Sequence, residues 1–143
     1  VNIMVHISNL ELIEILRKNA RISYVDIAKR FGVSETAVRK RIRNLEERGI
    51  IKGYTAEIDP RQLGYKIRAM IGVDTKPESY VSVLEKLMGM EDLKSLYASS
   101  GDHMLLFEVW LEDSSELNRF VKDIESIPGV TKVCPALLVE RIK

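Results

Sequence analysis

The sequence predicts an α+β protein of two domains. A helix-turn-helix domain, winged-helix-like in outline, should span residues 1–58, and a ferredoxin-like βαββαβ domain should span residues 66–143, with a linker at 59–65. Three observations predict this organisation. The two halves differ in charge, two short helix patterns in the first half are separated by three residues, and the second half contains a strand–helix–strand pattern twice.

The charge difference favours contact of the first half with a polyanion. Residues 1–53 hold 11 Lys and Arg against 6 Asp and Glu, whereas residues 54–143 hold 11 against 15. A basic segment joined to an acidic one indicates a division of roles, in which one half meets a polyanion and the other does not. An uneven scatter of surface charge is the alternative.

Composition bears on the cellular setting. With 45% hydrophobic residues the chain can form a packed core. The single Cys134 cannot form an internal disulfide, and we interpret it as a buried or interface thiol in a reducing compartment. No apolar run reaches the roughly 18 residues of a membrane span, and residues 1–8 lack the pattern of a signal peptide. We therefore expect a cytoplasmic protein without a membrane partner.

Caps and apolar spacing predict three helices in the first half. The first ends near Asn19. Ser23 can cap the second, with an acidic residue three positions later, and Gly32 ends it; Ser34 can cap the third, and Gly49 ends it. The buried faces should be Leu10, Leu12, Ile13, Ile15 and Leu16 in the first, Ile27, Ala28 and Phe31 in the second, and Val38, Ile42 and Leu45 in the third.

The segment after the third helix predicts one strand and then the domain boundary. Residues from Ile50 to Ile58 are rich in β-branched and aromatic side chains, which is typical of a strand. Asp59-Pro60 starts a turn, so the boundary should fall between Ile58 and Tyr65.

The third helix has the two faces that a DNA-recognition helix needs. Its apolar face can pack on the preceding helices, and the other side is cationic. Arg39 can donate two hydrogen bonds to guanine, and Glu35 can accept one from a cytosine amine. Lys40 and Arg43 are better placed for phosphates. The predicted contacts of double-stranded DNA are Ser34, Glu35, Thr36, Arg39, Lys40 and Arg43.

A solvated basic face on an ordinary helix is the alternative interpretation. The combination of a capped short helix, a Gly-Val-Ser turn and a capped amphipathic helix favours DNA binding. One such module makes few contacts, so at least a dimer is expected on the duplex.

The second half repeats itself weakly after a shift of 37 residues. Each copy has the pattern strand, helix, strand, and two copies give a four-stranded antiparallel sheet with both helices on one face. The uncovered face predicts a second subunit. The shift pairs Met70 with Phe107, Leu84 with Val121, Leu87 with Ile124, Met90 with Ile127, Leu93 with Val130, and Leu96 with Val133.

Both helices of the second half should face a core. Ser114 and Ser115 can cap the second of them. Pro135 predicts that the last strand lies at an edge or carries a bulge at that residue, because proline cannot donate to a ladder. The predicted core-facing residues are Tyr80, Val83, Leu84, Leu87 and Met88 in the first helix, and Leu117, Phe120, Val121, Ile124 and Ile127 in the second.

Nearly the whole chain resembles the Lrp/AsnC family, the feast/famine regulators of bacteria and archaea. The second half shares the βαββαβ pattern, Gly101-Asp102 between the middle strands, and Pro128-Gly129-Val130 before the last strand. The first half shares Ile15-Leu16, Asn19-Ala20-Arg21, Asp26-Ile27-Ala28, Val33-Ser34, Val38-Arg39-Lys40-Arg41-Ile42, Leu45-Glu46 and Gly49-Ile50-Ile51-Lys52-Gly53-Tyr54.

The resemblance implies a transcription regulator with an N-terminal DNA-binding domain and a C-terminal amino-acid-sensing and oligomerising domain. Family dimers commonly assemble further, often to octamers, and small effectors bind between subunits. A family-like effector site here would involve Ser99, Ser100, Gly101, Asp102 and His103.

This chain departs from the family pattern at three places. His103 and Met104 stand where the family often has an aromatic followed by Asp, and Asp102 can replace that carboxylate or serve only the turn. The last strand has Val-Cys-Pro where Thr or Ser is usual. Asn9 stands where Asp is usual. His103 could be an exposed tip residue, since a lone histidine is more often structural or solvated than a ligand or a switch.

No motif predicts an enzyme. The sequence has no phosphate-binding glycine-rich loop and no evident nucleophile–base set. Two histidines, His6 and His103, are too few for a metal site, so neither a metal nor a cofactor is expected, apart from an amino-acid effector. The rival interpretations are an architectural DNA-binding protein without an effector and a regulatory subunit of a metabolic enzyme.

Overall fold

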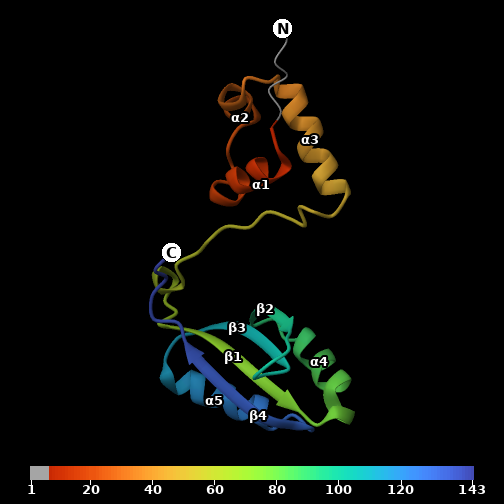
Figure 1. Cartoon of the computed structure of the whole chain (residues 1–143). Coiled ribbons are helices and arrows are strands. Elements are labelled where there is room, and N and C mark those ends of the chain that lie inside the picture. Colours follow the sequence, from red (N-terminus) through yellow and green to blue (C-terminus); the bar gives the residue numbers. More distant parts are fainter. Residues whose placement is uncertain (1–6) are drawn as a thin grey trace. The chain divides into compact units, whose positions relative to one another are not determined.

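The computed structural model describes residues 7–143 and divides the chain into two compact units, Val1–Glu57 and Ile58–Lys143 (Figure 1). Residues 1–6, which carry His6 and most of the segment examined for a signal peptide, lie outside the described residues. No helix within 7–143 has the length and apolar character that crossing a bilayer requires.

Within residues 7–57 the first unit contains three helices, and the predicted caps form. The Ser23 hydroxyl accepts a hydrogen bond from the Asp26 backbone N–H at 3.0 Å, and the Ser34 hydroxyl accepts one from the Ala37 N–H at 3.1 Å. Such caps stabilise a helix by about 1 kcal/mol. Gly32, at φ 65°, ends the second helix in the left-handed conformation. The helices are α1 (Asn9–Lys18), α2 (Tyr24–Phe31) and α3 (Glu35–Glu47).

The core of the first unit forms where the three helices meet. Val38, Ile42 and Leu45 are buried on α3, as the spacing predicts, against Ile27 and Ala28 of α2. Each fully buried aliphatic side chain contributes roughly 1.5–3 kcal/mol. Leu10 was predicted to be buried but is 69% exposed. Leu10 precedes the buried Leu12 by two residues, which is about 200° around the helix, so its side chain lies on the side away from the buried face.

The strand predicted over Ile50–Ile58 is absent. Residues 52–59 have no regular secondary structure, and Ile50, Tyr54 and Ile58 are exposed. A strand needs a hydrogen-bonded neighbour, and no described residue pairs with this segment. The predicted linker is instead folded in part: Pro60–Leu63 form a short 3-10 helix in the second unit, with Pro60 buried.

The second unit is an antiparallel sheet of four strands in the ferredoxin-like order β2 (Leu93–Ala98), β3 (Leu105–Leu111), β1 (Ile67–Thr75) and β4 (Val130–Leu137). Both helices pack on one face of the sheet (Figure 1). Strand β4 lies at an edge, which confirms the prediction from Pro135. The other elements are a 3-10 turn (Pro77–Ser79), α4 (Tyr80–Met88) and α5 (Ser114–Glu125).

The internal repeat holds for the helices but fails by one residue in the first strand. Leu87 and Ile124 are both buried, as their pairing predicts. Phe107 is buried in the core, whereas Met70 is only half-buried and stands between Ala69 and Ile71, which face that core. A shift of one residue moves a strand side chain to the other face, so the predicted pairing of Met70 with Phe107 is wrong.

Two smaller predictions in the helices are also wrong. Asp113, rather than Ser114 or Ser115, caps α5, because its carboxylate accepts a hydrogen bond from the Glu116 N–H at 2.8 Å. Met88 is 69% exposed. It follows the buried Leu87 by one residue and therefore lies about 100° away around the helix.

The helix-free face of the sheet carries a polar cluster. Glu108 accepts hydrogen bonds from Arg68 Nη2 at 3.0 Å and from Trp110 Nε1 at 2.7 Å. Lys94 Nζ lies 4.8 Å from the centre of the Trp110 ring. Cys134 is half-buried on this face, opposite a glycine of β1. The helix-free face of the sheet is therefore a partly exposed surface that carries both polar and apolar side chains.

Candidate nucleic-acid interface and effector loop

All six predicted DNA contacts lie on the exposed side of α3 or at its cap. The helix buries Val38, Ile42 and Leu45 and leaves the opposite side to solvent. The structure thus brings together, on one exposed surface, Ser34, Glu35, Thr36, Arg39, Lys40 and Arg43.

Arg39 and Glu35, which the sequence suggested as separate base contacts, form an ion pair. Arg39 Nη2 lies 2.7 Å from Glu35 Oε1, and the side chains are 57% and 46% exposed. The Arg39 guanidinium carbon also lies 5.3 Å from the centre of the Tyr24 ring, at the start of α2. An exposed pair at this spacing contributes only about 0.3–0.5 kcal/mol to stability. The spacing of four could have indicated the pair, whereas Tyr24 gave no sequence signal.

Arg41 is a structural cation within the same basic run. It is half-buried, and its Nη1 donates to the Ile7 carbonyl at 2.6 Å and to Asn9 Oδ1 at 3.0 Å. These bonds hold the start of α1 against α3. Lys40 and Arg43, by contrast, are exposed. Arg41 belongs to the run of residues that resembles the family, but it is not part of the exposed cationic surface of α3.

The predicted effector residues form the connection between β2 and β3. The Ser99 N–H donates to the Met104 carbonyl at 2.9 Å, and Gly101 has a φ of 114°, which favours glycine. Asp102 is exposed, and within residues 7–143 its carboxylate makes no hydrogen bond or ion pair. The loop therefore presents one uncommitted carboxylate next to a glycine.

His103 is held on the sheet rather than exposed at a loop tip, so the structural interpretation is confirmed and the exposed one is wrong. Its Nδ1 lies 3.0 Å from Asp74 Oδ2 on β1, and its side chain is 21% exposed. Asp74 Oδ1 also accepts a hydrogen bond from the Met104 N–H at 3.1 Å. The ring covers Gly72, where an added Cβ would meet His103 Cδ2 at 2.3 Å. Glycine thus leaves room for the imidazole on the sheet.

Asp74, which the sequence did not single out, lies beside the candidate effector loop. The family pattern led us to expect a carboxylate within the loop. Asp74 instead supplies one from the neighbouring strand β1. Asp74 and His103 are separated by 29 residues, and only the register of β1 with β3 brings them together. No local pattern could have indicated this contact.

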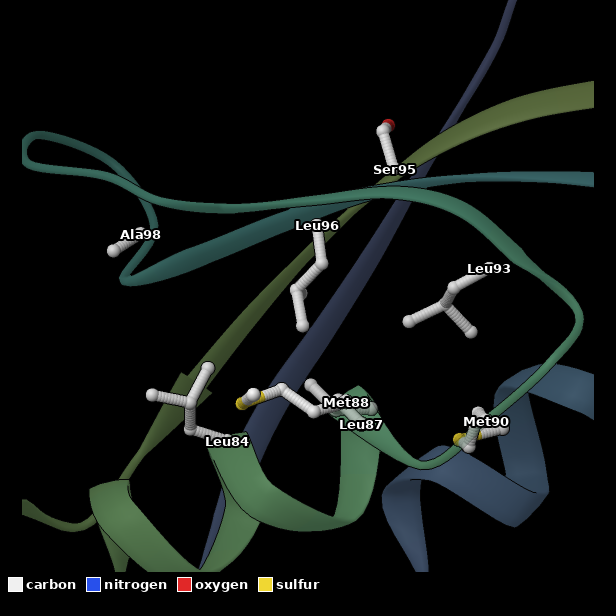
Figure 2. A pocket seen from close by; sticks show the side chains of 8 residues that line it. All are labelled: Leu84, Leu87, Met88, Met90, Leu93, Ser95, Leu96 and Ala98. Carbon is white, nitrogen blue, oxygen red and sulfur yellow. The ribbon is translucent and has the colours of Figure 1, made fainter. Parts of the chain in front are cut away.

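A separate apolar groove lies between α4 and β2. Figure 2 shows Leu84, Leu93 and Leu96 pointing into it, and its volume is ≈ 360 Å³. Ser95 supplies its only polar side chain among the lining residues. An amino acid needs partners for both its ammonium and its carboxylate groups. The groove offers too few of these, and it does not include the five predicted effector residues.

Glu108 and Tyr54 have perturbed pKa values. Burial raises the pKa of Glu108, but hydrogen bonds from Arg68 and Trp110 and the charge of Arg68 outweigh it, so the pKa lies below its usual value. Burial and then the charge of Glu46 raise the pKa of Tyr54. Among residues 7–143, no group of three or more His, Cys, Asp or Glu side chains is arranged to hold a metal ion.

Comparison with known proteins assigns both units. Residues 6–52 match the model of a winged helix-turn-helix DNA-binding domain, and residues 68–143 match that of the Lrp/AsnC ligand binding domain. The transcriptional regulator LrpA of Pyrococcus horikoshii is 50% identical over 133 residues, which is 92% of this chain and 94% of that protein. LrpA1 of Halobacterium salinarum is 42% identical over 129 residues, covering 90% of this chain and 91% of its own.

Solved structures agree with the fold. AsnC of E. coli superposes with a TM-score of 0.79 at 27% identity, covering 96% of this chain and 95% of that one. A transcriptional regulator from Neisseria meningitidis, solved in complex with L-Met, superposes with a TM-score of 0.84 at 21% identity, covering 96% and 93%. On the strength of its two domains and its relatives, the chain belongs to the Lrp/AsnC family of transcription regulators.

Proposed function

We propose that this regulator recognises specific operator half-sites with α3 and that a small effector, an amino acid, changes its assembly or its DNA affinity. The observation that carries the proposal is the division of α3 into a buried apolar face and an exposed cationic face. This division lets the helix remain fixed to its domain while its side chains reach a major groove.

Within α3 the side chains divide by role. Ser34, Glu35, Thr36 and Arg39, at the start of the helix, contact base edges and set sequence preference. Lys40 and Arg43 contact phosphates and set register and affinity. Because phosphate contacts release counterions, affinity should fall steeply as salt rises.

Two copies should act together on DNA. One helix-turn-helix module makes few contacts, and a homodimer would present two α3 helices to half-sites about 34 Å apart or a multiple of that distance. The helix-free face of the sheet, which carries Trp110 and Cys134, offers a surface for such an assembly. The family resemblance extends this to a higher oligomer such as an octamer.

The effector loop of residues 99–103 supplies groups of the right chemistry for an amino acid. Asp102 offers a carboxylate to the ammonium group, and a glycine-containing loop can offer backbone N–H groups to the carboxylate. The neisserial regulator of the same fold that holds L-Met makes amino acids the first class to test. We place the regulator in the cytoplasm, where its DNA and effector would be found, and assign it no enzymatic activity.

Replacing two cations tests this function. The variant Arg39→Ala/Arg43→Ala should keep its fold and lose specific operator binding in a mobility-shift titration. Arg119→Ala/Lys122→Ala removes the same charge from the exposed side of α5 and serves as the matched control. Operator affinity that survives the α3 change, or that falls equally in the control, would contradict the proposal.

A further inference from the structure

We infer that Glu35 and Tyr24 are positioning residues that hold Arg39 where it reads a guanine, and that Glu35 also selects the neighbouring base. The inference rests on the proposed function of α3 and adds the residues that give its first turn specificity. Three side chains on two helices meet here: Tyr24 at the start of α2, Glu35 at the start of α3, and Arg39 one turn later.

The two contacts of Arg39 constrain it in different ways. The Tyr24 ring, 5.3 Å from the guanidinium carbon, holds one side of the group. The Glu35 carboxylate, 2.7 Å from Nη2, fixes its rotation. Because an arginine side chain loses much rotamer freedom on binding, holding it beforehand lowers that cost. Guanidinium has five N–H donors and the contact with Glu35 engages one nitrogen, so donors remain for guanine O6 and N7.

A purely structural role does not account for this arrangement. The pair is largely exposed, where ion pairs add little to stability. Glu35 also places a negative charge on the surface that Lys40 and Arg43 make positive, and this charge weakens attraction to any phosphate backbone. A carboxylate in that place can discriminate between bases. It accepts a hydrogen bond from the cytosine amine and is repelled by acceptors such as thymine O4.

The test is base preference measured one position at a time. The full chain is first used to select binding sites from random duplex DNA, which should give a half-site with a guanine whose preference disappears in Arg39→Ala. Affinity is then measured for that site and for the same site carrying adenine in place of the guanine. The wild-type protein should prefer guanine by about 5- to 150-fold.

The variants separate positioning from folding. Glu35→Ala and Tyr24→Leu should reduce the preference for guanine to below about 5-fold, and Glu35→Ala should bind unrelated DNA more tightly because an anion is gone. Tyr24→Phe keeps the ring and should keep the preference. Glu14→Ala removes a carboxylate from a similar exposed pair with Arg17 on α1, 3.1 Å apart, and should change nothing.

The outcomes distinguish this inference from the proposed function. If Arg39→Ala abolishes the guanine preference while Glu35→Ala and Tyr24→Leu retain it, the inference is overturned and the recognition helix stands. The same holds if both variants weaken every position equally, since that is the effect of a loosened fold. If the wild-type protein selects no sequence at all, the proposed function fails and the inference fails with it.

Discussion

Asp74 on β1 contacts His103 of the β2–β3 loop, with Oδ2 and Nδ1 3.0 Å apart. The ring lies over Gly72, so the loop is fixed to the sheet beside the uncommitted carboxylate of Asp102. The shape of the predicted effector loop therefore depends on one glycine and one aspartate in a strand distant from it in sequence.

Gly72→Ala should lower the free energy of unfolding by about 1–3 kcal/mol, because the new Cβ would displace the His103 ring. Adding His103→Ala makes room, so the glycine substitution should cost much less in that background. Chemical denaturation of the four proteins measures the coupling. Gly89→Ala is the control, because a Cβ there meets its nearest neighbour at 3.6 Å. If Gly72→Ala lowered the free energy of unfolding equally with and without His103→Ala, the need for glycine at this position would not come from the His103 ring.

Asn9→Asp should stabilise the first unit by about 0.5–1 kcal/mol. The amide oxygen of Asn9 accepts a hydrogen bond from Arg41 Nη1 at 3.0 Å. A carboxylate would make this bond charge-assisted and would add a negative charge in the first turn of α1. Urea denaturation at low salt should show the gain, and 1 M salt should reduce it. A loss of stability, or a gain unaffected by salt, would contradict this reading of Arg41.

Glu108→Gln should destabilise the second unit by about 1–2 kcal/mol at pH 7, because hydrogen bonds to a charged acceptor become bonds to a neutral one. The folded-state pKa of Glu108 is lowered, so its contribution is present above the unfolded-state pKa of about 4.3 and is lost as pH falls through the folded-state value. Denaturation at pH 7, 5 and 3 should show the two proteins converging in acid. A difference that does not change with pH would mean that the charge is irrelevant.

One amino acid should raise the melting temperature of the wild-type protein. A ligand at 100 times its dissociation constant stabilises the folded state by about 2.7 kcal/mol. Asp102→Ala should reduce the shift, and Asp92→Ala, which removes another exposed carboxylate, should leave it unchanged. A screen in which none of the twenty amino acids shifts the transition would count against an amino-acid effector, as would an undiminished shift in Asp102→Ala.

The features that the sequence predicted well follow from local rules. Ser23, Ser34 and Gly32 mark helix ends because a cap bonds within one turn, and Val38, Ile42 and Leu45 share a face because of the helical period. The sheet order follows from two strand–helix–strand copies. All six predicted DNA contacts could accordingly be placed on one exposed surface, although their roles stay predictions.

The features that it missed depend on contacts between distant segments. Tyr24 meets Arg39 through the packing of α2 on α3, and Asp74 meets His103 through strand register. The repeat paired Met70 with Phe107 although their side chains lie on opposite faces, because an error of one residue reverses the faces of a strand. The strand expected over Ile50–Ile58 had the right composition but has no neighbour among the described residues.

Cleavage of operator DNA from a tethered reagent tests the central claim most directly. In a Cys134→Ser background, Thr36→Cys places a single thiol on the exposed side of α3, and Ser115→Cys places one on α5. A DNA-cleaving reagent attached at Thr36→Cys should cut bases within each half-site, and the same reagent at Ser115→Cys should not. Cleavage from α5 with none from α3 would contradict the account.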